Sequence, residues 1–320
     1  MTRLRTIFFG TPSLSVPYLE AVRTQTDLQL AVTQSDKPRG RGMEILPCPV
    51  KERAQALGVP VLSPEKLKDA FDELSATAFD VGVAVAYGKI FRPNVLSLAK
   101  TGFINVHFSL LPLLRGAAPV QQALINGYTK TGVSIFWINE GLDDGDLILQ
   151  REIPIDPADN AQTLFEKLVP LGVTCLREAL TLIENGNIIR RKQTGEPTFA
   201  PMLEKEIAFL NPATLTAEQL HNRVRGLACG PKPKLPFTRQ GKTEWLTLTE
   251  TKIGAHTSSQ PAGTVLCVER GQGILMKCKE GSVWLCRVQP AGKKPMNAED
   301  FANGRNIRPN ELLFIQGENK

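Results

Sequence analysis

Residues 103–107 read Phe-Ile-Asn-Val-His, and residues 109–119 continue Ser-Leu-Leu-Pro-Leu-Leu-Arg-Gly-Ala-Ala-Pro. The first run is apolar apart from Asn105 and His107, as expected for the end of a buried parallel strand. Because side chains alternate along a strand, Asn105 and His107 should point to the same face. Ligands of open α/β sheets bind beyond the carboxyl ends of the strands, so this stretch predicts a binding site at that edge.

The sequence on either side of this stretch alternates between strand-like and helical patterns. Strand-like runs lie at 6–9, 28–33, 81–86, 103–106, 132–137 and 147–150. Helical patterns lie at 16–24, 49–57, 64–74, 119–126 and 161–184. Pro119 suits a first helical position and Gly127 suits a C-terminal cap. The alternation predicts a Rossmann-like parallel sheet with helices on both faces.

A different pattern begins after residue 189. A helix-like stretch at 217–227 precedes short strands at 244–248, 263–268, 273–278 and 283–288. Glycine and proline separate these strands, which predicts a small β-barrel. We therefore expect an α/β domain over residues 1–189, a linker over 190–207 and a barrel domain over 208–320.

The composition is that of an ordinary water-soluble protein, with 42% hydrophobic and 22% charged residues. No apolar stretch approaches the roughly 18 residues that a membrane span needs. The chain passes from Met1 directly into a strand-like run, so we expect no signal or transit peptide. The cysteines lack C-x-x-C pairing and nearby histidines, so we expect reduced thiols in a cytoplasmic protein and no metal site. These cysteines are Cys48, Cys175, Cys229, Cys267, Cys278 and Cys286.

The net charge of +6 is concentrated in the last third of the chain. Residues 204–320 hold 17 Lys and Arg against 11 Asp and Glu, whereas the first 203 residues hold 21 of each. This asymmetry predicts a polyanionic partner for the C-terminal part. A solvated basic surface with no partner is the alternative, and charge by itself leaves both open.

Taken together, several sequence motifs resemble those of one protein family. The run from Asn105 to Pro119, with Gly-Leu-Asp-Asp-Gly-Asp at 141–146, resembles the 10-formyl-tetrahydrofolate-dependent formyltransferases. Three further segments narrow the resemblance to the branch that acts on methionyl-tRNA, and it then covers nearly the whole chain. These segments are Phe-Gly-Thr-Pro at 9–12, Asp-Lys-Pro-Arg-Gly-Arg-Gly at 36–42 and Gln-Pro-Ala-Gly-Lys-Lys-Pro-Met at 289–296.

The resemblance implies a complete reaction. The formyl group of 10-formyl-tetrahydrofolate would pass to the free α-amine of methionyl-tRNA, without a metal, on a cytoplasmic and monomeric enzyme. The family's C-terminal domain is an open barrel of the OB type that binds tRNA, in agreement with the pattern of short strands. Gly10-Thr11-Pro12 has one glycine where a dinucleotide-binding fold carries three, so we do not expect NAD.

Formyl transfer assigns chemistry to three side chains. Asn105 can donate its amide N–H to the carbonyl oxygen as that oxygen gains charge. His107 can exchange protons near neutrality, and a nearby carboxylate would favour its charged form. By residue type alone, the carboxylate beside His107 could come from any of three residues: Asp143, Asp144 or Asp146. By the family's register the catalytic aspartate is Asp143, and we expect Asp144 to be a solvated turn residue.

Two segments are expected to line the folate. Backbone groups and leucines after the catalytic strand can form a slot of pteridine size, and the end of an earlier strand resembles a folate-lining segment of the family. The alternative for the first segment is a plain strand-to-helix connection. The expected donor-binding residues are Ser109, Leu110, Leu111, Pro112, Val85, Tyr87 and Gly88.

An early loop is expected to contact the tRNA. Lys37, Arg39 and Arg41, which we call the basic loop, lie among glycines and prolines and suit phosphate contacts. In the family the equivalent insertion approaches the acceptor end of the tRNA, with Arg41 as the position we favour. A solvated loop would have a similar composition.

Some segments depart from the family pattern, and two rival functions remain. Phe108, Leu113 and Leu114 replace the usual residues beside the site, and residues 229–234 replace a usual Pro-Trp-Pro-Gly stretch. One rival is a formyltransferase for an amino sugar or another small amine, which would need neither the basic loop nor a basic barrel. The other is an RNA-binding module without catalysis, which would have no need of Asn105, His107 and Asp143 at the family's spacing.

Overall fold

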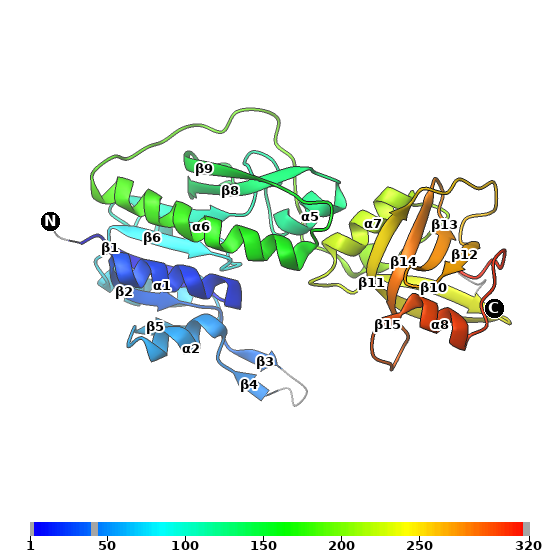
Figure 1. Ribbon diagram of the computed structural model, residues 1–320. Helices are drawn as coiled ribbons and strands as arrows, with labels where there is room; N and C mark the ends of the chain where they lie inside the picture. The colour runs from blue at the N-terminus through cyan, green and yellow to red at the C-terminus, as the bar shows by residue number, and fades with distance from the viewer. Residues whose placement is uncertain (1–2, 40–43, 316–320) are drawn as a thin grey trace. The chain divides into compact units, whose positions relative to one another are not determined.

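The computed structural model describes residues 3–39 and 44–315. The chain divides into two compact units (Figure 1). The first unit comprises Met1–Pro119, Lys130–Pro154 and Phe165–Pro201, and the second comprises Val120–Thr129, Ile155–Leu164 and Met202–Lys320. Residues 120–129 and 155–164 thus belong to the second unit, although segments of the first unit precede and follow each of them. The domain boundaries at residues 189 and 207 stay a prediction.

The first unit is built on a seven-stranded sheet with strand order β5-β2-β1-β6-β7-β8-β9. Its five parallel strands are β5 (Val61–Leu62), β2 (Asp27–Val32), β1 (Arg5–Gly10), β6 (Val81–Val85) and β7 (Gly102–His107). The predicted Rossmann-like architecture is confirmed.

The last two strands depart from an all-parallel arrangement. β8 (Lys130–Trp137) runs antiparallel to β7, and β9 (Leu147–Pro154) runs antiparallel to β8. Residues 138–146 are too few for the crossover of a dozen or more residues that parallel neighbours need. This short connection is the loop that carries Asp143.

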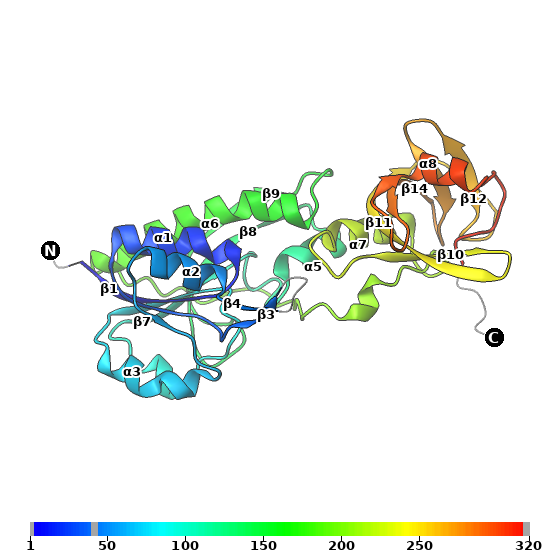
Figure 2. The same ribbon diagram turned by 90° about the horizontal axis from the view of Figure 1, so that it is seen from below.

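Helices cover both faces of the sheet, as predicted. Figure 2 shows α1 (Val16–Gln25) and α6 (Ala161–Glu184) along one face and α3 (Phe71–Ala76) on the other. Shorter helices of this unit are α2 (Pro49–Ala56) and α4 (Pro93–Leu96), whereas α5 (Pro119–Ile125) belongs to the second unit from Val120 on. As predicted, α5 starts at Pro119, and Gly127 after it has a φ of +71°.

The helix predicted over 64–74 is wrong in its first half. A 3-10 turn at Leu67–Ala70 comes first, and α3 begins only at Phe71. The carbonyls of Pro64 and Glu65 accept hydrogen bonds from Lys89 Nζ, at 2.8 and 2.5 Å, and are not used within a helix. A partner distant in sequence thus overrides the helical pattern.

One face of the sheet buries an aromatic cluster. Phe9 of β1 packs edge-on against Phe91, with ring centroids 5.1 Å apart, and Phe103 of β7 lies 5.3 Å from Phe91. Asn105 and His107 follow Phe103 at intervals of two, so they point to this same face. The core therefore ends where the polar pair begins, at the carboxyl end of β7.

The second unit contains a curled antiparallel sheet in the order β10-β11-β14-β13-β12, with β15 paired to β14. The strands are β10 (Lys234–Arg239), β11 (Lys242–Gly254), β12 (Val265–Glu269), β13 (Gly273–Lys277), β14 (Ser282–Gln289) and β15 (Met296–Asn297). The predicted small barrel domain is confirmed. β10 was not predicted, because Pro236 argues against a strand at that position. Proline is tolerated in an edge strand, and β10 lies at the edge of this sheet.

Two helices pack on this curled sheet. α7 (Ala217–Gly226) was predicted, and Thr216 caps it by accepting a hydrogen bond from the Gln219 backbone N–H at 3.2 Å. No sequence pattern predicted α8 (Ala298–Gly304), which packs on β13 and β14. Within the described residues, no helix is both long and apolar enough to cross a membrane.

Candidate active site

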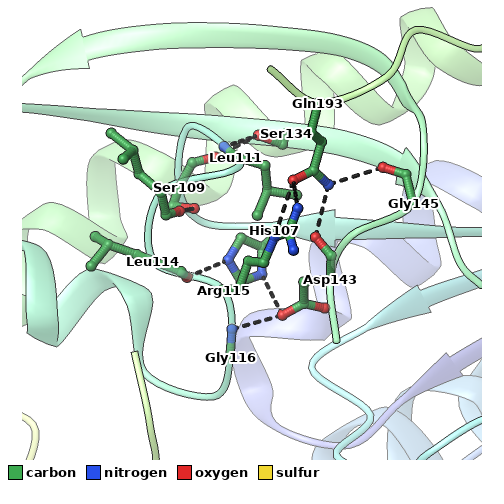
Figure 3. Close-up of polar contacts among 11 residues, drawn as sticks. His107, Ser109, Leu111, Leu114, Arg115, Gly116, Ser134, Asp143, Gly145 and Gln193 are labelled. Carbon is green, nitrogen blue, oxygen red and sulfur yellow. Dashed lines mark hydrogen bonds and ion pairs between the residues drawn. The ribbon is translucent and has the colours of Figure 1, made fainter. Parts of the chain in front are cut away.

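His107 ends β7 and is held between two partners. Its side chain is nearly fully buried, and Nε2 lies 2.9 Å from the Leu114 carbonyl oxygen. Nδ1 lies 3.7 Å from Oδ2 of Asp143 (Figure 3). Because a carbonyl can only accept, Nε2 must carry the hydrogen, and Nδ1 of the neutral ring then faces the carboxylate as an acceptor.

Two opposing effects act on the charge of this ring. Burial lowers the pKa of His107 below its usual 6.5, because a buried imidazolium loses its hydration. The Asp143 carboxylate raises the same pKa, and so does the hydrogen bond to Leu114. The ring is therefore suited to being neutral at rest and to gaining a proton with help from Asp143.

Asp143 reaches the ring from the loop between β8 and β9. Its backbone adopts a φ of +48°, and Oδ2 accepts a hydrogen bond from the Gly116 backbone N–H at 2.8 Å. The loop lies tightly against β8, where a Cβ on Gly145 would come within 1.8 Å of the Trp137 carbonyl oxygen. Of the three competing aspartates, Asp143 is the one placed beside His107, whereas Asp144 is exposed.

Asn105 is free to contact a substrate. It lies two residues before His107 on β7 and pairs through its backbone with Phe136 and Ala84. Its side chain is partly exposed and makes no hydrogen bond within the described residues. The structure thus brings the three predicted side chains to one edge of the sheet. Their catalytic roles stay predictions.

The segment predicted to form the folate slot is pinned to the antiparallel strands. Ser134 Oγ donates to the Ser109 carbonyl oxygen at 2.6 Å and accepts from the Leu111 backbone N–H at 3.1 Å. Gln150 Nε2 donates to Ser134 Oγ and to the Leu111 carbonyl oxygen, both at 2.9 Å. Ser109, Leu111 and Pro112 are buried, and Leu110 is partly exposed. This stretch is therefore hydrogen-bonded to β8 and β9, with most of its side chains turned into the protein.

The other predicted donor-binding residues have different surroundings. Val85 is fully buried, and the Tyr87 ring packs against Phe9 in the aromatic cluster. Gly88 has a φ of +74° and lines a cavity of about 590 Å³ together with Lys89. What residues 85–88 offer a ligand is therefore the backbone around Gly88, not the tyrosine ring.

The basic loop is described only in part. Lys37 and Arg39 lie on β3 (Lys37–Arg39), which pairs with β4 (Glu44–Leu46), and Arg41 lies outside the described residues. Lys37 is exposed, and its Nζ donates to Gln34 Oε1 at 3.4 Å. This hairpin is a projection from the sheet (Figure 1). Its contact with tRNA stays a prediction.

Sequence reasoning missed the residues that hold the site together. Ser134, Gln150 and Gln193 each bond to backbone groups of the loops around His107. Gln193 lies in the stretch that was expected to be a linker. Ser134 and Gln150 face each other across β8 and β9, a pairing that no local pattern displays, and no local pattern pointed to Gln193 either.

Comparison with known proteins agrees with this geometry. A protein-family model described as "Formyl transferase" matches residues 3–180, and "Formyl transferase, C-terminal domain" matches residues 202–306. A methionyl-tRNA formyltransferase of Elusimicrobium minutum (strain Pei191) is 43% identical over 97% of this chain and 100% of its own length. The Bacillus subtilis (strain 168) protein of the same name is 38% identical over 99% of both chains.

Solved structures share the fold at much lower identity. HypX from Aquifex aeolicus, in complex with tetrahydrofolic acid, has a TM-score of 0.62 and 15% identity over 94% of this chain and 47% of its own. An N-formyltransferase from Helicobacter canadensis has a TM-score of 0.64 and 17% identity over 91% of this chain and 100% of its own. The family models, together with relatives matched over nearly their full length, show that the chain belongs to the methionyl-tRNA formyltransferases of the formyl transferase family.

Proposed function

We propose that this chain transfers the formyl group of 10-formyl-tetrahydrofolate to the α-amine of methionyl-tRNA, giving formylmethionyl-tRNA for the initiation of translation. The observation that carries the proposal is the buried His107 ring, with the Asp143 carboxylate 3.7 Å from Nδ1 and Asn105 on the same strand face. The identity of the curated relatives, 38–43% over nearly the whole chain, supports methionyl-tRNA as the acceptor.

The reaction follows from the chemistry of these groups. The neutral amine of the methionyl ester attacks the formyl carbon, a C–N bond forms, and the carbonyl oxygen becomes an oxyanion that Asn105 can stabilise with its amide N–H. The attacking nitrogen then loses a proton to Nδ1 of His107, because Nε2 is already protonated and donates to Leu114. Asp143 stabilises the imidazolium, which returns the proton to N10 as the C–N10 bond breaks and tetrahydrofolate leaves.

The tRNA is proposed to contact both parts of the chain. The excess of basic residues over 204–320, 17 against 11 acidic, suits a polyanion, and Lys37 is exposed on the β3–β4 hairpin. We place Ser109, Leu110, Leu111 and Pro112 around the folate. The segment of Val85, Tyr87 and Gly88 would contribute the backbone around Gly88 and not its buried side chains. The enzyme is proposed to act as a monomer in the cytoplasm.

The decisive experiment offers the purified protein three acceptors. Methionyl-tRNA, free methionine and a nucleotide-linked amino sugar are each incubated with 10-formyl-tetrahydrofolate, and mass spectrometry detects the added formyl group. We expect formylation of methionyl-tRNA and its loss, by at least about 10²-fold, in His107→Ala. Formylation of the amino sugar alone would support the first rival. Ultrafiltration with labelled tetrahydrofolate and with tRNA, in separate samples, tests the second rival. A protein that retains tRNA but not the labelled folate would support the RNA-binding module.

A further inference from the structure

Gln193 joins the two loops that flank His107. Its Nε2 donates to the carbonyl oxygens of Asp143 and Gly145, at 2.8 and 2.9 Å. Its Oε1 accepts from Arg115, at 2.7 Å from Nη2 and 3.2 Å from Nε (Figure 3). Both N–H groups and both lone pairs of the carboxamide are thus used within the protein. Gln193 has no capacity left to bind a substrate.

The residues after Gln193 run alongside the loop after β7. The Leu114 backbone N–H donates to Thr198 Oγ1 at 2.8 Å, and the Arg115 N–H donates to the Thr198 carbonyl at 2.9 Å. Ala200 N–H returns a bond to the Arg115 carbonyl at 2.8 Å. Leu114 supplies the carbonyl that accepts the His107 N–H. One segment therefore fixes both partners of the imidazole, one on each side.

The conformation of Asp143 depends on contacts with the residues around it. A non-glycine residue with a φ of +48° is in a sparsely populated conformation that persists when its surroundings impose it. Within the described residues, the one hydrogen bond to its carboxylate comes from Gly116 N–H. The two bonds from Gln193 hold the carbonyl groups of the Asp143–Asp144 and Gly145–Asp146 peptides, so the direction of the Asp143 side chain depends on them.

We infer that Gln193 is a positioning residue for formyl transfer, which holds Asp143 against His107 without contacting either substrate. This inference rests on the proposed function for its kinetic part. A misplacement of about 1 Å at a reacting group can slow catalysis by roughly 10²-fold. Gln193→Met keeps the length of the side chain and removes all four hydrogen bonds. We expect kcat to fall about 10- to 100-fold, with KM for both substrates within about threefold of wild type.

A double-mutant cycle separates positioning from simple stabilisation. If Gln193 acts through Asp143, then Gln193→Met should have less than a twofold effect on kcat in an Asp143→Asn background. Gln193→Glu should be as slow as Gln193→Met, because a carboxylate oxygen cannot donate to two carbonyls. Gln25→Ala is the matched control. Gln25 also donates two hydrogen bonds from Nε2, to Arg177 and Thr181 of α6, and its loss should leave kcat unchanged.

A second measurement, the NMR titration of His107, does not depend on the substrate that accepts the formyl group. The chain has three histidines, so the His107 imidazole can be identified by NMR, and among described residues Asp143 is the charged group acting on it. Gln193→Met should lower the pKa of His107 in the direction produced by Asp143→Asn. Equal kcat losses from Gln193→Met with and without Asp143, or an unshifted His107 titration, would overturn the inference. Wild-type protein that fails to formylate methionyl-tRNA would instead count against the proposed function, and the titration would still decide the role of Gln193.

Discussion

Replacing Asp143 by asparagine tests the central electrostatic interaction of the site. The amide keeps the shape of the side chain, and its oxygen can still accept the 2.8 Å hydrogen bond from Gly116 N–H. The substitution removes the negative charge 3.7 Å from Nδ1 of His107. Because that charge raises the pKa of His107 against the effect of burial, its removal should lower this pKa further.

The size of the effect follows from the distance. Two unit charges 3.7 Å apart interact by about 4.5 kcal/mol at an effective dielectric constant of about 20. The Asp143 side chain is 18% exposed, so solvent screening should reduce this to about 2–4 kcal/mol. At about 1.4 kcal/mol per factor of ten, kcat should fall roughly 30- to 1,000-fold if the imidazolium forms in the transition state.

Initial rates at saturating methionyl-tRNA and formyl donor, measured from acid to neutral pH, would check this. The acid limb of the wild-type profile should report the protonation of His107, and the variant should have a lower plateau with its limb at lower pH. Asp144→Asn is the control, since its carboxylate is exposed on the same loop and should be replaceable within twofold. A variant Asp143→Asn within threefold of wild type, with an unmoved acid limb, would refute the reasoning.

Three further outcomes are expected. Ser134→Ala should leave the buried Leu111 N–H without its partner, which should cost about 1–3 kcal/mol in urea unfolding and raise KM for the donor. The control is Ser97→Ala, which should do neither, because Ser97 is exposed after α4 and its Oγ donates to the nearby Asn94 carbonyl. Neutralising the basic loop should weaken tRNA use and flatten its dependence on salt, and an unchanged salt slope would contradict a phosphate contact. Burial lowers the pKa of His221 to about 4, so the unfolded chain takes up a proton at a higher pH than the folded one and stability falls with acidification from about pH 7. His107, whose pKa burial also lowers, acts in the same direction in both proteins, so the test is the difference between them. Allowing for partial exposure, urea unfolding should show a loss of stability between pH 7 and 5 that is about 1 kcal/mol smaller in His221→Gln than in wild type.

The sequence predicted those parts of the site that local patterns specify. Alternation along residues 103–107 placed Asn105 and His107 on one face, and the structure has both there. The choice of Asp143 among three aspartates needed the family resemblance, because its approach to the ring depends on a φ of +48° and on Gly116, 27 residues earlier. Neither of these is visible in local composition.

Gln193 shows where such reasoning ends. The charged and polar run around it reads as a linker, yet its carboxamide bonds to residues 48 to 78 positions away. Hydrogen bonds between distant segments have no periodicity for a sequence pattern to display. The same limit applies to residues 64–66. Their sequence has a helical pattern, but the carbonyls of Pro64 and Glu65 accept hydrogen bonds from the ammonium group of Lys89.

The tautomer of His107 gives the most direct physical test of the mechanism. Nε2–H donates to the Leu114 carbonyl, so the neutral ring presents the lone pair of Nδ1 to the Asp143 carboxylate, and two acceptors repel each other. This repulsion accounts for a separation of 3.7 Å, longer than a hydrogen bond, while the carboxylate stays bound to Gly116. Protonation turns Nδ1 into a donor, and the contact should then shorten to about 2.7–2.9 Å. Nitrogen-15 shifts of the imidazole should therefore show the Nε2–H form above the pKa of His107, and an Nδ1–H form would exclude proton uptake at Nδ1.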